Sequence, residues 1–302
     1  METLSVTTAA VAAPLDLQAR MLAVVDGMDV NSETKRKYAK RVSHISSAIE
    51  RYIATNVQPA DWMSTYRREL EGECKTASTA AAYFAAASAI MKRLHALGAL
   101  PFDITAGVRG VQIERGHKRT GVTRAEAECI KTALATADTR TRAIFALLLL
   151  HGLRQIEVVR LDVEDFDEAN NLLFVQGKGR TDKEPILLNP AAAAALSAHI
   201  KAARITEGAI FRSIDRANAG SRLTTRSVAR IVKAVFNTCN INRTPHGLRH
   251  LFVTVLLEAL NGDVLKVQRW SRHRSTAMLE VYNDERNTAK TAPAVFQALG
   301  GI

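Results

Sequence analysis

Residues 244–250 read Thr-Pro-His-Gly-Leu-Arg-His, and no other stretch of the chain is as informative. Thr244 is a suitable N-cap for a helix whose first residue is proline. His246, Arg249 and His250 then stand at positions i, i+3 and i+4, so they share one face near the positive end of that helix. Three potential cations beside free backbone N–H groups predict an anion site, because a hydrophobic core would not hold them without a counter-charge.

Three further segments carry side chains that suit the same chemistry. Arg154 directly follows a helix break in His-Gly-Leu-Arg, and an acid, Glu157, comes three residues later. Lys178 stands between two glycines in a predicted hairpin turn, where it is exposed and can reach into a groove. Tyr282 follows His273 by nine residues. Taken alone, each has an ordinary explanation: an ion pair on a helix face, a polar turn residue, or a packed tyrosine.

Together, the order and spacing of these segments resemble the catalytic half of the tyrosine recombinases, the phage integrase family. The family pattern is an arginine in a G-L-R-x-x-E box, a lysine in a G-K-G hairpin, an H-x-L-R-H box, a histidine or tryptophan, and a tyrosine nine residues later. The resemblance covers residues 122–290, whereas the preceding part agrees only in being helical and basic. Two positions depart from the pattern: Ser271-Arg272-His273 replaces Leu-Gly-His, and Thr276 lies slightly early in the segment that follows.

The resemblance implies that Arg154 and Arg249 hold the non-bridging oxygens of a scissile DNA phosphate. His246 and His273 would add hydrogen bonds to the same oxygens, and Glu157 would orient the neighbouring arginine or histidines. Because attack on phosphorus places further charge on these oxygens, preorganised cations stabilise the transition state more than the ground state.

The resemblance also assigns the groups that make and break bonds. Tyr282 would attack phosphorus and form a 3′-phosphotyrosyl link, freeing a 5′-hydroxyl. His250 would accept or orient the phenolic proton, since a phenol of pKa about 10 is a poor nucleophile at neutral pH. Lys178 would protonate the leaving 5′-oxygen. The covalent link conserves the energy of the broken bond, so we expect neither ATP nor a metal or other cofactor.

The composition favours a polyanionic partner. The 302 residues include 41 Lys and Arg against 30 Asp and Glu, a net charge of +11, and the isoelectric point is near 9.8. Each cation set against a phosphate releases a condensed counterion, although a basic solvated surface has the same composition. Three scattered cysteines indicate buried thiols in a reducing compartment, and the longest apolar run, 143–150, is too short to cross a bilayer. Because no basic segment precedes an apolar one at its start, the chain is expected in the cytoplasm.

Periodicity and turn residues predict a mainly α fold with a small antiparallel β-sheet. The resemblance implies a helical N-terminal core-binding domain followed by an α+β tyrosine recombinase catalytic domain. Helices are expected over 17–28, 32–53 with Ser32 as N-cap, 59–70, 77–97, 123–135 with a Thr123–Glu126 capping box, and 139–151. Strands are expected over 172–176 and 184–188, as a hairpin. The expected divisions are a flexible tail 1–16, a DNA-clamp domain 17–106, a linker 107–121, the catalytic domain 122–290 and a C-terminal tail 291–302.

Two basic clusters are candidate DNA contacts outside the catalytic residues. The helix expected over 32–53 places Ile45, Ile49 and Tyr52 on one face, so its other face is basic. A solvated charged face would give the same pattern. The first cluster, near the start of that helix, is Lys35, Arg36, Lys37, Lys40 and Arg41, and the second, in the linker, is Lys118 and Arg119.

The resemblance implies double-stranded DNA with inverted-repeat core sites as the partner, bound by a homotetramer away from any membrane. The tail 291–302 either packs into a neighbouring protomer or folds back on its own domain. Two other functions stay open: a type IB topoisomerase, which relaxes supercoils by the same chemistry as a monomer, and a DNA-binding regulator without catalysis. The size and the helical first part favour the recombinase over the topoisomerase. A regulator has no use for an aligned tyrosine.

Overall fold

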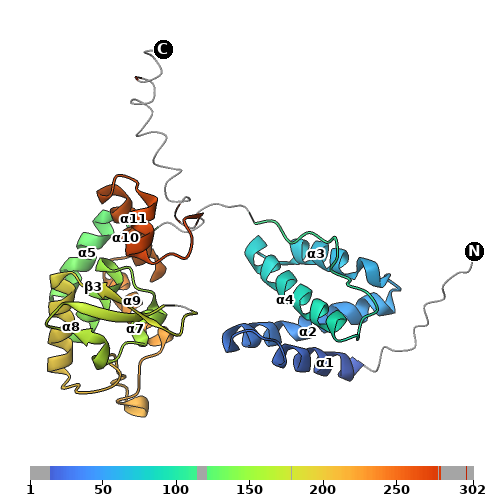
Figure 1. The fold of residues 1–302 in the computed structure, drawn as a ribbon, viewed down its shortest axis with the longest axis horizontal. Coiled ribbons are helices and arrows are strands. Elements are labelled where there is room, and N and C mark those ends of the chain that lie inside the picture. The colour runs from blue at the N-terminus through green and yellow to red at the C-terminus, as the bar shows by residue number, and fades with distance from the viewer. Residues whose placement is uncertain (1–13, 114–120, 178, 278, 280–296, 298–302) are drawn as a thin grey trace, which may run out of the picture. The chain divides into compact units, whose positions relative to one another are not determined.

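The computed structural model describes residues 14–113, 121–177, 179–277, 279 and 297, and the chain divides into two compact units (Figure 1). The division between positions 115 and 116 falls inside the segment expected to be a linker. Both units are mainly helical, and the one sheet among the described residues is small and antiparallel. The predicted fold class is therefore confirmed. No helix in the described ranges combines the length and the apolar character needed to span a bilayer.

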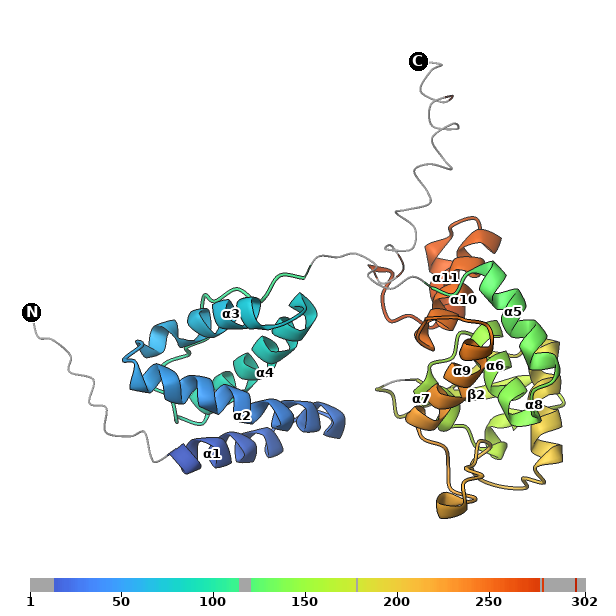
Figure 2. The ribbon, with the colours of Figure 1, turned by 180° about the vertical axis from the view of Figure 1, so that it is seen from behind.

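The first unit packs its helices in neighbouring pairs. Its helices are α1 (Pro14–Asp26), α2 (Ser32–Ala54), α3 (Trp62–Glu73) and α4 (Ala77–Ala96). α1 contacts α2, and α3 contacts α4, which Figure 2 shows from behind. Apolar side chains at helical spacing, such as Ile45 and Tyr52 of α2, are buried between the helices. The predicted helix 59–70 begins instead as a 3₁₀ turn, η1 (Pro59–Asp61), which α3 follows.

The starts of the first two helices differ from the expected ones. α1 begins at Pro14 rather than at Leu17, so the last positions assigned to the flexible tail belong to the helix. Asn31, and not Ser32, caps α2. The side-chain oxygen of Asn31 accepts a hydrogen bond from the backbone N–H of Thr34 at 2.9 Å, which satisfies an amide that the helix leaves unpaired.

The second unit is built around α6 (Thr139–Leu150), which contacts α8, α9 and α10. A helix that is apolar on nearly every side belongs in an interior, which accounts for the run 143–150. The predicted capping box is present before α5, since Thr123 and Glu126 each accept a hydrogen bond from the other's backbone N–H. The other elements are α5 (Arg124–Ala135), α7 (Gln155–Val159), η2 (Val163–Asp165), α8 (Pro190–Ala202), η3 (Arg216–Asn218), α9 (Thr225–Thr238), α10 (His246–Ala259) and α11 (Val264–Ser271).

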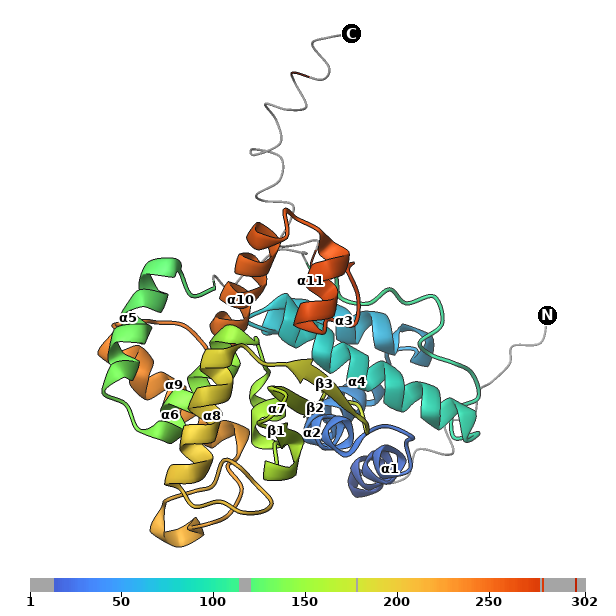
Figure 3. The same cartoon turned by 60° about the vertical axis from the view of Figure 1, so that its left-hand side comes forward.

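The sheet has the strand order β1 (Phe166–Asp167), β2 (Leu172–Gln176) and β3 (Lys183–Leu187), with both pairs antiparallel. Leu173 and Val175 of β2 are buried while Phe174 between them is exposed, the alternation expected of a strand with one face on the core. The second predicted strand lies at 183–187 rather than 184–188, and the two-residue β1 was not predicted. Figure 3 shows the β2–β3 hairpin and, at one end of the unit, α10 beside α11.

Candidate active site

Gly152, two residues after the end of α6, sets the direction of the segment that carries Arg154. Its φ of +56° lies in the left-handed region, which glycine adopts without steric cost. A Cβ at this position would stand 2.3 Å from Cδ1 of Phe252, so the backbone passes this buried ring too closely for any side chain. Arg154 follows as the residue that precedes α7, with its side chain 25 % exposed.

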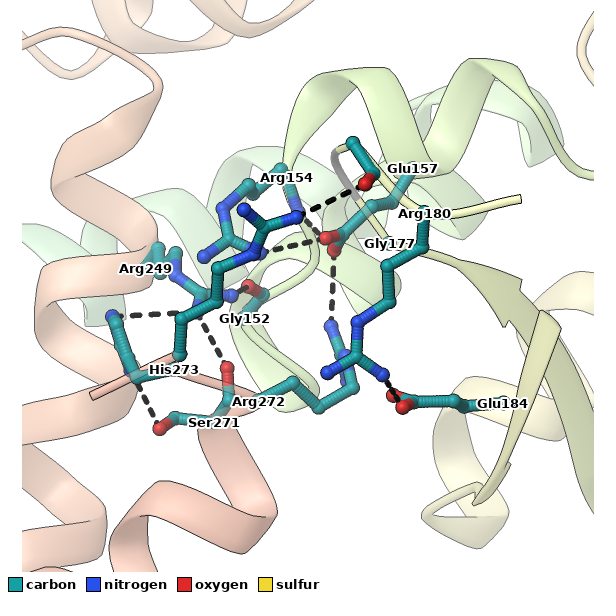
Figure 4. Close-up of polar contacts among 12 residues, drawn as sticks. Gly152, Arg154, Glu157, Gly177, Arg180, Glu184, Arg249, Ser271, Arg272 and His273 are labelled. Atoms are coloured by element: carbon teal, nitrogen blue, oxygen red, sulfur yellow. Dashed lines mark hydrogen bonds and ion pairs between the residues drawn. The ribbon is translucent and has the colours of Figure 1, made fainter. Parts of the chain in front are cut away.

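Glu157, in α7, holds two guanidinium groups. Its buried carboxylate accepts hydrogen bonds from Nη1 of Arg154 at 2.8 Å and from the backbone N–H of Arg154 at 2.9 Å. Nη2 of Arg272 donates to the same carboxylate at 3.0 Å (Figure 4). Burial alone would raise the pKa of Glu157, but the charge of Arg272 and the hydrogen bonds from Arg154 lower it. The carboxylate is therefore ionised and fixes the orientation of Arg154.

Arg249 of α10 joins the ends of two other helices. The residue is 2 % exposed, and Nη1 donates to the carbonyl of Gly152 at 2.5 Å while Nη2 donates to the carbonyl of Ser271 at 2.5 Å. Nη2 also lies 3.3 Å from Nε2 of His273. Because acceptors on both sides hold the planar fork, the guanidinium is preorganised.

His273 is neutral, and its tautomer follows from its neighbours. Burial, followed by the charge of Arg249, lowers the pKa of His273 to about 3. Since a guanidinium can only donate, Nε2 of the ring accepts from Arg249. Nδ1 then carries the proton and donates to Oγ of Ser271 at 2.6 Å. The imidazole thus orients Arg249.

The two histidines of α10 lie against each other. The rings of His246 and His250 meet edge to face with centroids 5.0 Å apart, and His246 is exposed whereas His250 is buried. Gly121 packs closely against His250, so that a Cβ on the glycine would stand 2.8 Å from Cβ of this histidine. The first described residues of the second unit therefore fix the position of His250.

The start of α10 differs from the predicted anion site in one respect. The helix begins at His246, and Pro245, although helical in its dihedrals, contributes no side-chain cap. The N–H of Gly247 donates to the carbonyl of Thr244 at 2.8 Å, and the N–H of Leu248 donates to the carbonyl of Pro245 at 3.2 Å. Because these amides are occupied, attraction for an anion comes from side chains rather than from free backbone N–H groups.

His151, next to the glycine that follows α6, has a structural place. The ring is buried, and its Nε2 accepts a hydrogen bond from the backbone N–H of Asn189 at 3.1 Å. Burial, followed by the charge of Arg272, lowers the pKa of His151 to about 4. The neutral ring links the end of α6 to the residue before α8.

Two arginines contact the glycines of the hairpin turn. Nη2 of Arg274 donates to the carbonyl of Gly179 at 3.0 Å, and Nη1 of Arg160 lies 3.5 Å from the carbonyl of Gly177. The turn is therefore tied to the segment after α11.

Outside the described residues lie four of the predicted site residues: Lys178, Tyr282, Lys118 and Arg119.

The basic cluster of α2 divides into paired and unpaired side chains. Lys35 donates to a backbone carbonyl of α1, Lys37 pairs at 2.7 Å with an acid one turn earlier, and Arg41 lies 5.3 Å from the centre of a tyrosine ring. Arg36 and Lys40 are exposed and bind no other residue in the part of the chain that the structure describes. They are the members of the cluster best placed to meet a phosphate.

Arg272 and Ser271 contribute to the site but were not among the predicted site residues. The replacement of Leu-Gly-His by Ser-Arg-His marked this segment as unusual. Nothing local in the sequence indicates that Arg272 bonds a buried carboxylate 115 positions earlier.

Comparison with known proteins agrees with this architecture. A family model described as the phage integrase family matches residues 121–288. The tyrosine recombinase slr0733 of Synechocystis sp. is 30% identical over 230 residues, which cover 74% of this chain and 73% of that protein. The tyrosine recombinase XerC of Lactobacillus delbrueckii subsp. bulgaricus is 26% identical over 242 residues, which cover 73% of this chain and 79% of XerC.

Solved structures share the fold. A lambda integrase dimer bound to a COC′ core site matches with a TM-score of 0.69 at 18% identity, over 90% of this chain and 96% of that one. The XerH recombinase bound to a difH substrate after cleavage matches with a TM-score of 0.68 at 15% identity, over 93% of this chain and 94% of that one. The family match and the relative slr0733, added to this fold, identify an enzyme that breaks and rejoins DNA strands. The chain belongs to the phage integrase family, and it is a site-specific tyrosine recombinase.

Proposed function

We propose that Tyr282 attacks a DNA phosphate held by Arg154 and Arg249. The phenolic oxygen forms a bond to phosphorus while the bond from phosphorus to the 5′-oxygen breaks, which leaves a 3′-phosphotyrosyl link. His250 takes the phenolic proton, and Lys178 supplies a proton to the leaving 5′-oxygen. A 5′-hydroxyl from a second strand then reverses these steps, so rejoining needs neither ATP nor a cofactor.

The observation that supports this assignment best is the meeting of Arg154, Arg249 and His273 from segments far apart in the chain. The side chain of Arg249 bonds both to Gly152, which follows α6, and to Ser271, the last residue of α11. A basic cluster of this kind is complementary to an anion that gains charge during reaction. Removing one such donor typically slows the chemical step by a factor on the order of 10²–10³.

Ser271 gives His273 two ways to act. In the structure, Nδ1 donates to the hydroxyl, and Nε2 accepts from Arg249. A serine hydroxyl can also donate, so it equally suits the tautomer whose proton is on Nε2. We infer that this second tautomer donates to a phosphate oxygen once DNA occupies the site, in which case Arg249 turns its Nη2 to the phosphate as well.

The relatives suggest how the chain assembles. One solved structure is a lambda integrase tetramer bound to a Holliday junction, and another is XerH bound to a palindromic difH substrate. We infer that this chain likewise acts as a homotetramer, on double-stranded DNA whose core sites are inverted repeats, in the cytoplasm. Within it, residues 17–106 would clamp the DNA, residues 107–121 would link them to the catalytic residues 122–290, and the tail 291–302 would pack into a neighbouring protomer.

A DNA substrate with a nick beside the cleavage point tests the nucleophile. Cleavage then releases a short fragment that cannot return, so the covalent protein–DNA complex accumulates and can be seen on a denaturing gel. We expect this complex with the parent chain and none with Tyr282→Phe, which removes only the attacking oxygen. A complex that persists in Tyr282→Phe would refute the assignment.

Plasmids carrying one or two copies of the target site test whether strand cleavage leads to exchange between sites. Exchange between paired sites is expected of a recombinase. Relaxation of supercoils without exchange would instead indicate a type IB topoisomerase, and binding with no covalent complex would indicate a regulator. The family match over residues 121–288 favours the recombinase.

A further inference from the structure

Arg272 occupies a backbone conformation that side chains other than glycine rarely adopt. It directly follows α11 with φ 54° and ψ 40°, in the left-handed region. The family pattern Leu-Gly-His, which the chain departs from here, has glycine at this position. Strained backbone of this kind persists where surrounding contacts hold it, and such positions concentrate at functional sites.

The contact that holds Arg272 is its ion pair with Glu157. Nη2 lies 3.0 Å from Oε2 of the carboxylate, and the arginine side chain is only 12 % exposed (Figure 4). Nε of Arg272 is also buried and has no hydrogen-bond partner among the described residues. A buried guanidinium is thus directed at the carboxylate that orients Arg154.

The charges of the cluster explain what this contact does. As an isolated pair, Arg154 and Glu157 carry no net charge, so the acid offsets part of the attraction of Arg154 for a phosphate. Arg272 adds a second cation to the same carboxylate, so the three groups together carry one net positive charge. Arg249 adds another, and His273 next to it is neutral.

We infer that Arg272 is a positioning residue: by sharing the Glu157 carboxylate it offsets the negative charge beside Arg154 and so strengthens the attraction of Arg154 for the scissile phosphate. The inference rests on the proposed function. Arg272 acts through Glu157 and Arg154, and its substitution is expected to affect the chemical step more than DNA affinity.

Arg272→Gly tests the inference, because glycine suits the backbone and removes the guanidinium. We expect covalent complex formation on the nicked substrate to slow by a factor on the order of 10–100, with DNA affinity changed less than about threefold. Arg204→Gly is the matched control. Arg204 is exposed, has φ 51° and lies after α8, so its substitution relieves the same backbone conformation and should leave the cleavage rate unchanged.

Adding Glu157→Gln to Arg272→Gly distinguishes loss of the positive charge from loss of the connection between the two segments. In Arg272→Gly, the uncompensated carboxylate opposes Arg154, and replacing it with a neutral amide restores the net charge of the group while keeping an acceptor. The double variant should therefore cleave faster than Arg272→Gly by at least about threefold. Melting temperatures of all variants establish that they are folded. Arg272→Lys, which keeps the charge, should retain more activity than Arg272→Gly.

Three results would overturn the inference. An Arg272→Gly chain that cleaves at the parent rate would remove any role for the arginine. A double variant as slow as Arg272→Gly, or slower, would mean that the arginine acts only as a latch between segments. A parent chain that forms no covalent complex would refute the proposed nucleophile, and this inference with it, whereas the first two results leave the nucleophile intact.

Discussion

Replacing Gly152 with alanine adds only one methyl group, but it should lower the free energy of unfolding of the second unit substantially. The added Cβ would stand 2.3 Å from Cδ1 and 2.9 Å from Cγ and Cε1 of Phe252, distances at which atoms cannot remain. The ring is buried in a cluster with Val253 and Leu257, so it has little room to move. The carbonyl of Gly152 also accepts Nη1 of Arg249, and a shift of the backbone would displace that guanidinium.

Two costs contribute to the expected loss of stability. Holding alanine in the left-handed region costs about 1–2 kcal/mol, and inserting a methyl group into a packed core costs about 1–3 kcal/mol. Gly152→Ala should therefore lower the free energy of unfolding of the second unit by about 2–5 kcal/mol. Gly220 has φ +82°, and a Cβ there would meet nothing within 4 Å, so Gly220→Ala should lose only about 1–2 kcal/mol.

Urea unfolding followed by tryptophan fluorescence can measure the difference. The sequence has two tryptophans, Trp62 in the first unit and Trp270 in the second, so a Trp62→Phe background reports on the second unit alone. Adding Phe252→Leu should recover part of the loss in Gly152→Ala, since the smaller side chain makes room. Equal losses in Gly152→Ala and Gly220→Ala, or no recovery with Phe252→Leu, would refute the steric argument.

Three further substitutions test other parts of the site. His151→Gln keeps a hydrogen-bond acceptor but cannot titrate. In the parent chain the pKa of His151 is about 4 in the folded state and 6.5 in the unfolded state. The histidine therefore stabilises the folded state above pH 6.5, and this stabilisation is lost as the pH falls towards 4. Between pH 7 and pH 5 the parent chain should therefore lose about 2 kcal/mol more of its free energy of unfolding than the variant, and identical pH profiles would contradict this. Ser271→Ala should slow cleavage about fivefold through the lost partner of His273, whereas Ser271→Thr should not, and equal rates in a single-turnover assay would dismiss the hydroxyl. Gly121→Ala should lower the free energy of unfolding by about 1–3 kcal/mol, measured in urea, because its Cβ meets Cβ of His250, and an unchanged midpoint would be inconsistent with that contact.

Local signals in the sequence located most elements because their causes are local. The capping box of α5 depends on Thr123 and Glu126 alone, and both side chains make the expected bonds. Where two adjacent residues could each cap a helix, as at Asn31 and Ser32, composition did not choose between them. The two-residue strand β1 was missed because it is too short to have a period, and it forms only by pairing with β2.

The site residues that could be predicted from the sequence are those that belong to the family pattern. The pattern singled out Arg154, Glu157, Arg249 and His273, and the structure brings these four together. The arginine–carboxylate bond of Arg272 has no local cause, since its partner is 115 positions away and its backbone conformation is one that arginine rarely adopts. The occupied amides at the start of α10 were missed for a similar reason, because the first turn tightens in a way that its residues alone do not reveal.

The shared carboxylate limits how segments of this enzyme can be exchanged with those of related recombinases. A chimera that took its last part from a relative with glycine at position 272 would keep Glu157 with a single guanidinium and a changed charge balance. A relative given Arg272 without the matching acid would have to bury a cation beside other cations. Arg272 therefore depends on Glu157, although the two residues are encoded 115 positions apart.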